Sequence, residues 1–253
     1  MPTAVCEKCQ GSGWIVRERD GISGAERCDC LQAGRAARTL EDAGIPPNYR
    51  NASLEPNSFL IPRDNPVAAR ELSNVAMQVN RFVREFPTPD KPGVLFIGSP
   101  GTGKTHLAVG VLKALIARGF EGVFFDYQNL LERIRSSFDP ASGTSDREAY
   151  RTALETDILL LDDLGAHRVT EFTEDTITSI ITYRCNQRKA LIATTNLRDP
   201  ELGDRRGSGL EGDVNSRFFL EERIGMRARS RLFEMCRIVR MPAIEDYRIR
   251  TRR

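Results

Sequence analysis

The stretch Gly98–Thr105, with the sequence GSPGTGKT, constrains the fold of this chain more than any other. It matches the phosphate-binding pattern G-x-x-x-x-G-K-[ST] at every position. The apolar run 94–97 before it is typical of a buried strand, and 107–116 after it has the apolar spacing of a helix. Strand, glycine-rich loop and helix in this order predict a phosphate-binding loop in an α/β domain. The alternative is a chance match in a glycine-rich turn.

The residue types of this loop suit a nucleotide. Glycines permit backbone angles that a Cβ would forbid, so successive N–H groups can turn toward phosphate oxygens at the positive end of the next helix. Lys104 is expected to reach the β- and γ-phosphates, and the Thr105 hydroxyl to bind Mg²⁺. His106 is expected to be a packed helix residue rather than a catalyst. The residues predicted to hold the nucleotide are Gly98, Ser99, Pro100, Gly101, Thr102, Gly103, Lys104, Thr105, His106 and Asp162.

Two further apolar runs end in polar side chains. The run 157–165 carries Asp162 and Asp163. Asp162 is expected to hold Mg²⁺ through its water shell, and Asp163 to orient or deprotonate the attacking water; the alternative is two turn aspartates. The run 190–196 ends in Asn196, whose amide can meet the γ-phosphate or simply cap a strand. Strands alternating with helices predict a parallel sheet with nucleotide at its carboxyl edge.

The remaining periodicity fills in the elements around these motifs. Alternation over 236–241 is typical of an edge strand, and 122–126 of a further strand. Gly203–Asp213 reads as a flexible loop without an assigned role. Helices are predicted over 31–43, 66–86, 128–138, 147–155, 170–186 and 219–235.

Four of the six cysteines fall within the first thirty residues, as Cys6, Cys9, Cys28 and Cys30. Two short cysteine turns joined by a small hairpin supply the four soft ligands of a structural Zn²⁺ site. A segment of roughly 30 residues has too little core to fold alone, so metal would contribute much of its stability. Two disulfides or a redox-active Cys-x-x-Cys are the alternatives. The other two cysteines, in a predicted helix and strand, are expected to be buried thiols.

Composition bounds the class of protein. No apolar run approaches the ~20 residues of a membrane span, and the N-terminus lacks a signal pattern, so a cytoplasmic protein without membrane contact is expected. The formal net charge of +2 does not indicate a nucleic-acid binder. Arginines nevertheless concentrate after residue 222, where they can meet phosphates or form a solvated face. We expect a zinc-binding region over 1–44, a linker over 45–65 and an ATPase domain over 66–253.

The motifs together resemble a known family. GKTH at the loop, LLLDDLG, ATTN and the SRL of a basic helix, followed by Asp246-Tyr-Arg248, look like the AAA+ helicase loaders of the DnaC/DnaI type and the similar IstB transposition ATPases. The N-terminal cysteines and Gly44–Arg50 resemble DnaC-type loaders that carry a zinc-binding region. The resemblance implies an AAA+ P-loop fold, here without a large C-terminal lid.

The resemblance also implies roles. Family members bind ATP and Mg²⁺, contact single-stranded DNA and deliver the hexameric replicative helicase to it. Asn196 matches sensor 1, and Arg248 matches the sensor 2 arginine. Arg231 matches the arginine finger, which implies self-association; Arg227 or Arg229 are alternatives for that role.

Three functions follow as hypotheses. The first is an ATPase that loads the replicative DNA helicase onto single-stranded DNA during replication initiation or restart. Its hydrolysis is expected to be slow, because Asp163 stands where AAA+ proteins usually carry a longer glutamate. The second is an IstB-type ATPase that acts on DNA with a transposase, and the third is a nucleotide-bound scaffold with negligible turnover.

Overall fold

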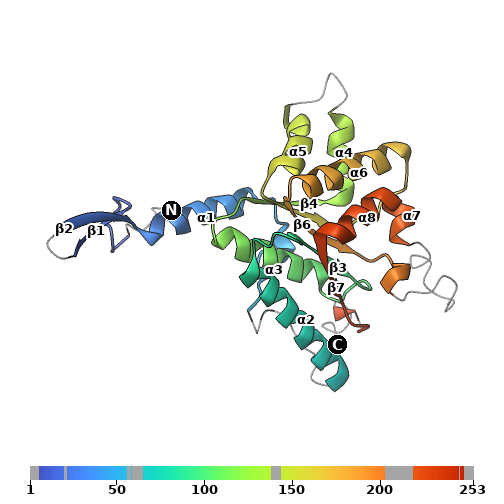
Figure 1. Ribbon diagram of the computed structural model, residues 1–253, viewed down its shortest axis with the longest axis horizontal. Coiled ribbons are helices and arrows are strands. Elements are labelled where there is room, and N and C mark those ends of the chain that lie inside the picture. The colour runs from blue at the N-terminus through green and yellow to red at the C-terminus, as the bar shows by residue number, and fades with distance from the viewer. Residues whose placement is uncertain are drawn as a thin grey trace.

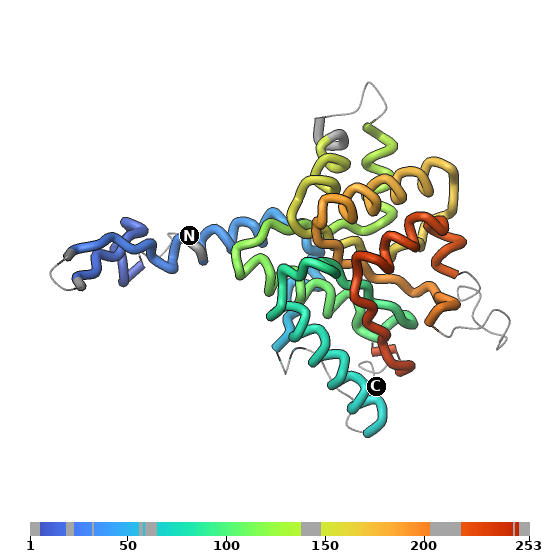
Figure 2. The backbone as a smooth tube through the Cα atoms, in the orientation of Figure 1, coloured from blue at the N-terminus to red at the C-terminus, as the bar shows by residue number. Residues whose placement is uncertain are grey.

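The computed structural model describes residues 6–19, 22–55, 58, 65–137, 144–202, 219–244 and 246–247. A five-stranded sheet forms the centre, helices cover both of its faces, and a two-stranded hairpin projects from one side (Figures 1 and 2). The predicted α/β class with a helix-flanked parallel sheet is therefore confirmed. Arg248 and the loop Gly203–Asp213 lie outside the described residues.

All neighbouring strands of the central sheet are parallel, in the order β4-β5-β6-β3-β7. Three of them are buried at every residue, because helices cover both faces and the strands are almost continuously apolar. The strand predicted to lie at an edge does so, next to the strand that precedes the phosphate-binding loop. The strands are β3 (Gly93–Ile97), β4 (Gly122–Asp126), β5 (Ile158–Asp162), β6 (Ala190–Thr195) and β7 (Cys236–Arg240).

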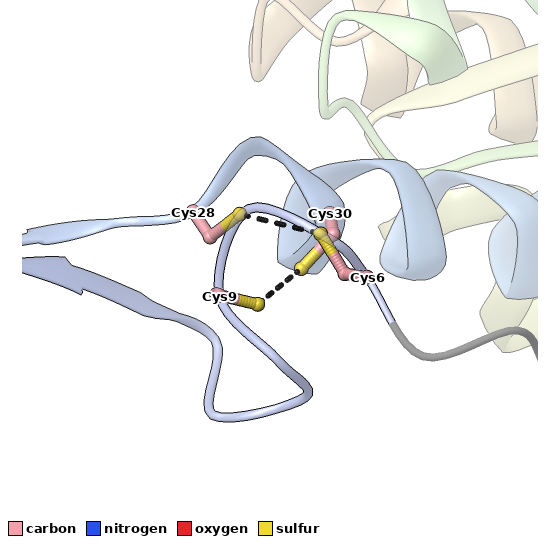
Figure 3. Close-up of side chains that lie close together, drawn as sticks. All are labelled: Cys6, Cys9, Cys28 and Cys30. Atoms are coloured by element: carbon pink, nitrogen blue, oxygen red, sulfur yellow. Dashed lines mark hydrogen bonds between the residues drawn. The ribbon is translucent and has the colours of Figure 1, made fainter.

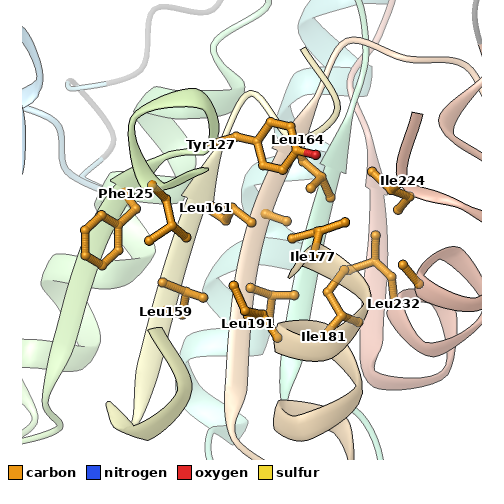
Figure 4. Close-up of a cluster of buried hydrophobic side chains, with 14 of the residues drawn as sticks. Phe125, Tyr127, Leu159, Leu161, Leu164, Ile177, Ile181, Leu191, Ile224 and Leu232 are labelled. Atoms are coloured by element: carbon orange, nitrogen blue, oxygen red, sulfur yellow. The ribbon is translucent and has the colours of Figure 1, made fainter. Parts of the chain in front are cut away.

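Alternate residues of each strand enter two different hydrophobic clusters. In β5, Leu159 and Leu161 face one cluster, whereas Ile158 and Leu160 face the other. Figure 4 shows the first cluster, between the sheet and the helices on that face. These helices are α4 (Tyr127–Ser136), α5 (Thr144–Glu155), α6 (Glu171–Asn186), α7 (Leu220–Ile224) and α8 (Met226–Met235). The second cluster is closed by α2 (Pro66–Glu85) and α3 (Lys104–Ala117).

One predicted helix is two helices. The expected helix over 219–235 is interrupted at Gly225, whose φ of 81° lies in the left-handed region. A Cβ at this position would lie 2.3 Å from Oε1 of Glu174 on α6, so a larger residue would also displace the end of that side chain. The break separates α7 from α8, and each helix buries its own residues.

The N-terminal part forms an arm. Strands β1 (Trp14–Arg19) and β2 (Ile22–Arg27) pair antiparallel, and helix α1 (Asp29–Asp42) joins this hairpin to the body (Figure 1). The small hairpin predicted between the cysteine pairs is thus present. None of the four N-terminal cysteines belongs to either hydrophobic cluster.

The chain after α1 packs on the central domain. The Phe124 N–H donates to the Ala43 carbonyl at 2.7 Å, and Lys113 Nζ donates to the Arg50 carbonyl at 2.7 Å. Ala43 and Ala52 are buried, and a short 3-10 helix covers Pro47–Tyr49. A second short 3-10 helix, Pro200–Leu202, follows β6. Among the described residues, no helix has both the length and the apolar character to cross a membrane.

Candidate nucleotide-binding and metal sites

The phosphate-binding loop lies between β3 and α3, where the sequence predicts it. Gly101 and Gly103 have φ values of 74° and 90°, which glycine adopts without strain. Gly103 is the N-cap of α3, so the first N–H groups of that helix open toward the loop. Lys104 Nζ and Thr102 Oγ1 both donate to the Ser99 carbonyl, at 2.8 and 2.9 Å. The buried Lys104 ammonium is thus held over a loop that can cradle an anion.

Asp162 ends β5 and is buried. Thr194 Oγ1 donates to its Oδ1 at 2.6 Å, and the Asp163 N–H donates to Thr194 Oγ1 at 2.9 Å. Burial raises the pKa of Asp162 to about 6, against the opposing effect of hydrogen bonds from Thr194 and Thr105. The contact with Thr105 brings the two predicted Mg²⁺ ligands together. A bound cation would favour the ionised carboxylate, so the donor set fits Mg²⁺.

Asp163 and Asn196 face each other at the same edge of the sheet. Asn196 Nδ2 donates to Asp163 Oδ1 at 3.3 Å. Asp163 has a φ of 53°, which turns its side chain away from the buried strand, and it is only half-buried. This places a solvated carboxylate and an amide beside the loop that would hold the phosphates.

Sequence reasoning missed Thr194, which links both aspartates. Its signal was a pair of hydroxyl residues, Thr194 and Thr195, at the end of a fully buried strand, because a buried polar group needs a partner. It also missed the contact of the C-terminal segment with the loop. The Tyr247 N–H donates to the Gly101 carbonyl at 3.2 Å, and a Cβ on Gly101 would lie 2.0 Å from Cγ of Asp246.

His106 is the third residue of α3, and its side chain contacts the segment before α2. Its Nε2 lies 3.0 Å from Ser58 Oγ, and the Ser53 N–H also donates to Ser58 Oγ. Burial lowers the pKa of His106. The side chain therefore joins the nucleotide-loop helix to the segment that follows the arm.

The three arginines considered for the finger differ in their surroundings. Arg229 forms a two-bond ion pair with the fully buried Asp199, with Nε to Oδ2 and Nη2 to Oδ1 both at 2.6 Å. Arg231 is exposed and pairs with Glu234 at 2.6 Å. Arg227 is exposed on the same helix. Arg229 is thus held within its own chain, whereas Arg227 and Arg231 point outward.

Cys6, Cys9, Cys28 and Cys30 converge at the base of the hairpin (Figure 3). Their sulfurs all lie within 4.8 Å of one another, with Cys6–Cys28 at 3.8 Å and Cys9–Cys30 at 3.4 Å. Four sulfurs around a tetrahedral Zn²⁺ with bonds of about 2.3 Å would be separated by about 3.8 Å, so the cluster fits zinc. Hydrogen bonds with the Cys9 and Cys28 side chains raise the pKa of Cys30 to about 12. The other thiols differ: Cys236 is buried and Cys185 is half-buried.

Comparison with known proteins agrees with this geometry. The family model described as "IstB-like ATP binding protein" matches residues 70–204, which is 135 of the 253 residues. A crystal structure of the DnaC helicase loader is 32% identical, with a TM-score of 0.60; the match covers 78% of this chain and all of that one. A crystal structure of DnaI, 20% identical with a TM-score of 0.54 over 79% of this chain and 93% of that one, shares the fold.

The replicative helicase loader DnaC of Escherichia coli strain K12 is 25% identical over 171 residues. That match covers 68% of this chain and 66% of the relative's length. A structure of AMPPCP-bound DnaA from Aquifex aeolicus, 20% identical with a TM-score of 0.52 over 82% of this chain and 54% of that one, shares the AAA+ fold. The chain therefore belongs to the AAA+ family of IstB-like ATP-binding proteins, together with the DnaC-type helicase loaders.

Proposed function

We propose that this protein is an ATPase that loads the replicative DNA helicase onto single-stranded DNA. The observation that carries the proposal is the combination of two features in one chain. A phosphate-binding loop, an aspartate pair and Asn196 meet at one sheet edge, and a four-cysteine module projects from the same domain on α1. The DnaC loaders, to which the chain is similar, supply the functional class.

The nucleotide site would work as follows. The loop N–H groups and Lys104 bind the phosphates, and Thr105 and Asp162 hold Mg²⁺, which neutralises phosphate charge when bound. Asp163 orients the attacking water and accepts its proton, while the Asn196 amide holds the Asp163 carboxylate in place. Hydrolysis is slow, because an aspartate reaches less far than a glutamate at this position.

Completion of the site needs a second subunit. Arg231 projects from α8 and would stabilise the γ-phosphate charge on a neighbouring copy, as an arginine finger does. Arg248 would act as the sensor 2 arginine, and its neighbour Tyr247 contacts the phosphate-binding loop. Self-association through Arg231 is thus part of the proposal.

The arm and the basic C-terminal region would contact the partners. Zinc held by the four cysteines fixes the hairpin, and the hairpin and α1 grip the helicase. Single-stranded DNA binds along the basic face, where arginines neutralise phosphates without reading sequence. ATP orders these contacts, and hydrolysis releases the loader.

The family match itself supports a second function, an IstB-type ATPase that acts on DNA with a transposase. The two are separated by a pull-down of the cognate replicative helicase on the immobilised full chain, with and without ATP. If the protein is a loader, the full chain should capture the helicase. The double variant Cys6→Ser and Cys9→Ser, which removes two of the four cysteines, should lose this capture. Lys8→Ala, an exposed residue in the same segment, is the matched control and should keep it. Absence of capture under both conditions would contradict loading and favour the transposition function.

A further inference from the structure

The buried ion pair between Asp199 and Arg229 joins two parts of the proposed ATPase site that act in different subunits. Asp199 follows Asn196 by three residues and is fully buried, and the Arg229 side chain is 12% exposed. The pair has two parallel hydrogen bonds at 2.6 Å, and Arg229 also contacts Glu201 at 3.2 Å. Two-bond guanidinium–carboxylate pairs fix both distance and orientation.

The segment on the Asp199 side is tightly connected to the aspartate turn. The Leu164 N–H donates to the Thr194 carbonyl and Thr195 Oγ1 donates to the Leu164 carbonyl, each at 2.8 Å. A Cβ on Gly165 would lie 2.5 Å from Leu197, so the two turns pack without space between them. A shift at Asp163 or Asn196 therefore moves the start of the segment that holds Asp199.

The segment on the Arg229 side is the helix that carries the proposed finger. Arg229 and Arg231 are two residues apart on α8, so they project about 200° from each other, one inward and one outward. The guanidinium of Arg229 also lies 4.6 Å from the Phe233 ring centroid, which restricts its motion further. The inward arginine thus fixes the rotation and position of the outward one.

We infer that the Asp199–Arg229 pair is a positioning element, which fixes α8, and with it Arg231, against the turn that carries Asn196. This inference rests on the proposed function of Arg231 as a finger acting in trans. A buried charge pair is a poor source of stability, since an apolar pair of similar volume is often as stable. Its specific geometry accounts better for its presence here. The pair would in this way hold the finger that one subunit presents to the next.

Mixed assemblies on the helicase test the inference. Lys104→Ala subunits cannot bind nucleotide but still carry Arg231, whereas Arg231→Ala subunits bind nucleotide but lack the finger. ATP is therefore hydrolysed only where an Arg231→Ala subunit holds the nucleotide and a neighbouring Lys104→Ala subunit supplies the finger. Adding Asp199→Asn to the Lys104→Ala subunit leaves every nucleotide-binding subunit unaltered. We expect this addition to lower turnover at least tenfold, and Glu201→Gln in the same subunit, which removes only the exposed partner of Arg229, to change it less than twofold.

Asp199→Glu, which keeps the charge but lengthens the side chain, provides a second variant if Asp199→Asn does not fold. Unchanged turnover with a folded Asp199 variant in the finger-donating subunit would overturn the inference. If the mixture of Lys104→Ala and Arg231→Ala subunits is itself inactive while wild type hydrolyses ATP, the finger assignment fails, and the positioning role falls with it.

Discussion

Arg184 of α6 provides the sharpest test of what holds the sheet and helices together. Its side chain is fully buried and donates to five backbone carbonyls. Three belong to the end of α5 and the residue after it, where carbonyls have no helical partner and carry the negative end of the helix dipole. The other two precede β5 and begin β6. Burial lowers the pKa of Arg184 to about 9, so it remains charged at neutral pH.

Replacement of Arg184 by methionine keeps most of the volume and removes every donor. Each buried carbonyl left without a partner costs about 1–3 kcal/mol. If backbone shifts or water satisfy about half of the five, the free energy of unfolding falls by about 2.5–7.5 kcal/mol, a large part of the ~5–15 kcal/mol of an ordinary domain. Arg184→Lys, which retains the charge and up to three donors, is expected to cost about half as much.

Urea unfolding followed by far-UV circular dichroism measures this difference. Arg151→Met on exposed α5 surface is the matched control and is expected to stay within about 0.5 kcal/mol of wild type. If Arg184→Met also unfolds within about 0.5 kcal/mol of wild type, the carbonyl-capping argument is refuted.

Three further predictions concern the site, the arm and the edge of the sheet. Thr194→Val removes the hydroxyl that joins Asp162 to the Asp163 N–H. The rate of ATP turnover should fall about 10–100-fold, which corresponds to about 1.4–2.7 kcal/mol, while ATP affinity changes little. A rate equal to that of wild type would contradict the assigned geometry. Chelation should release one zinc per chain and expose the hairpin to protease, while the thermal midpoint of the central domain stays constant, because neither hydrophobic cluster contains these cysteines. Hydrogen bonds from Arg81 and Arg237 lower the pKa of Glu85. The ionised Glu85 side chain therefore stabilises the folded protein above pH 4.5, and this contribution is lost as pH falls through the folded-state pKa. The stability difference between wild type and Glu85→Gln should therefore shrink on acidification, and a constant difference would refute the ion-pair assignment.

Most elements of the fold were predictable because their signals are local. Buried parallel strands are short apolar runs bounded by turn residues. Strands β3, β5 and β6 lie where the runs 94–97, 157–165 and 190–196 predict them. The differences arise at glycines with left-handed backbones. Gly225, with a φ of 81°, divides the predicted helix over 219–235, and α3 starts at Lys104 because Gly103 takes a left-handed conformation as its N-cap.

The pairings that shape the candidate site were beyond sequence reasoning. Asp162 was identified from its strand, but its hydrogen bond with Thr194 joins residues 32 positions apart. The pairing of Asp199 with Arg229 likewise depends on how α8 packs, since either residue alone reads as an ordinary surface charge. The five carbonyls around Arg184 come from the segment 153–157 and from Ala190, which meet only in the folded domain.

Transfer of the cognate replicative helicase to closed circles of single-stranded DNA tests the central claim most directly. The helicase bound per circle is counted after the circles are isolated, with wild-type protein or Lys104→Ala, in ATP and Mg²⁺. The account predicts that wild type raises the helicase bound at least tenfold and that Lys104→Ala does not. Equal transfer by both proteins, or no transfer by wild type that binds ATP, would contradict it.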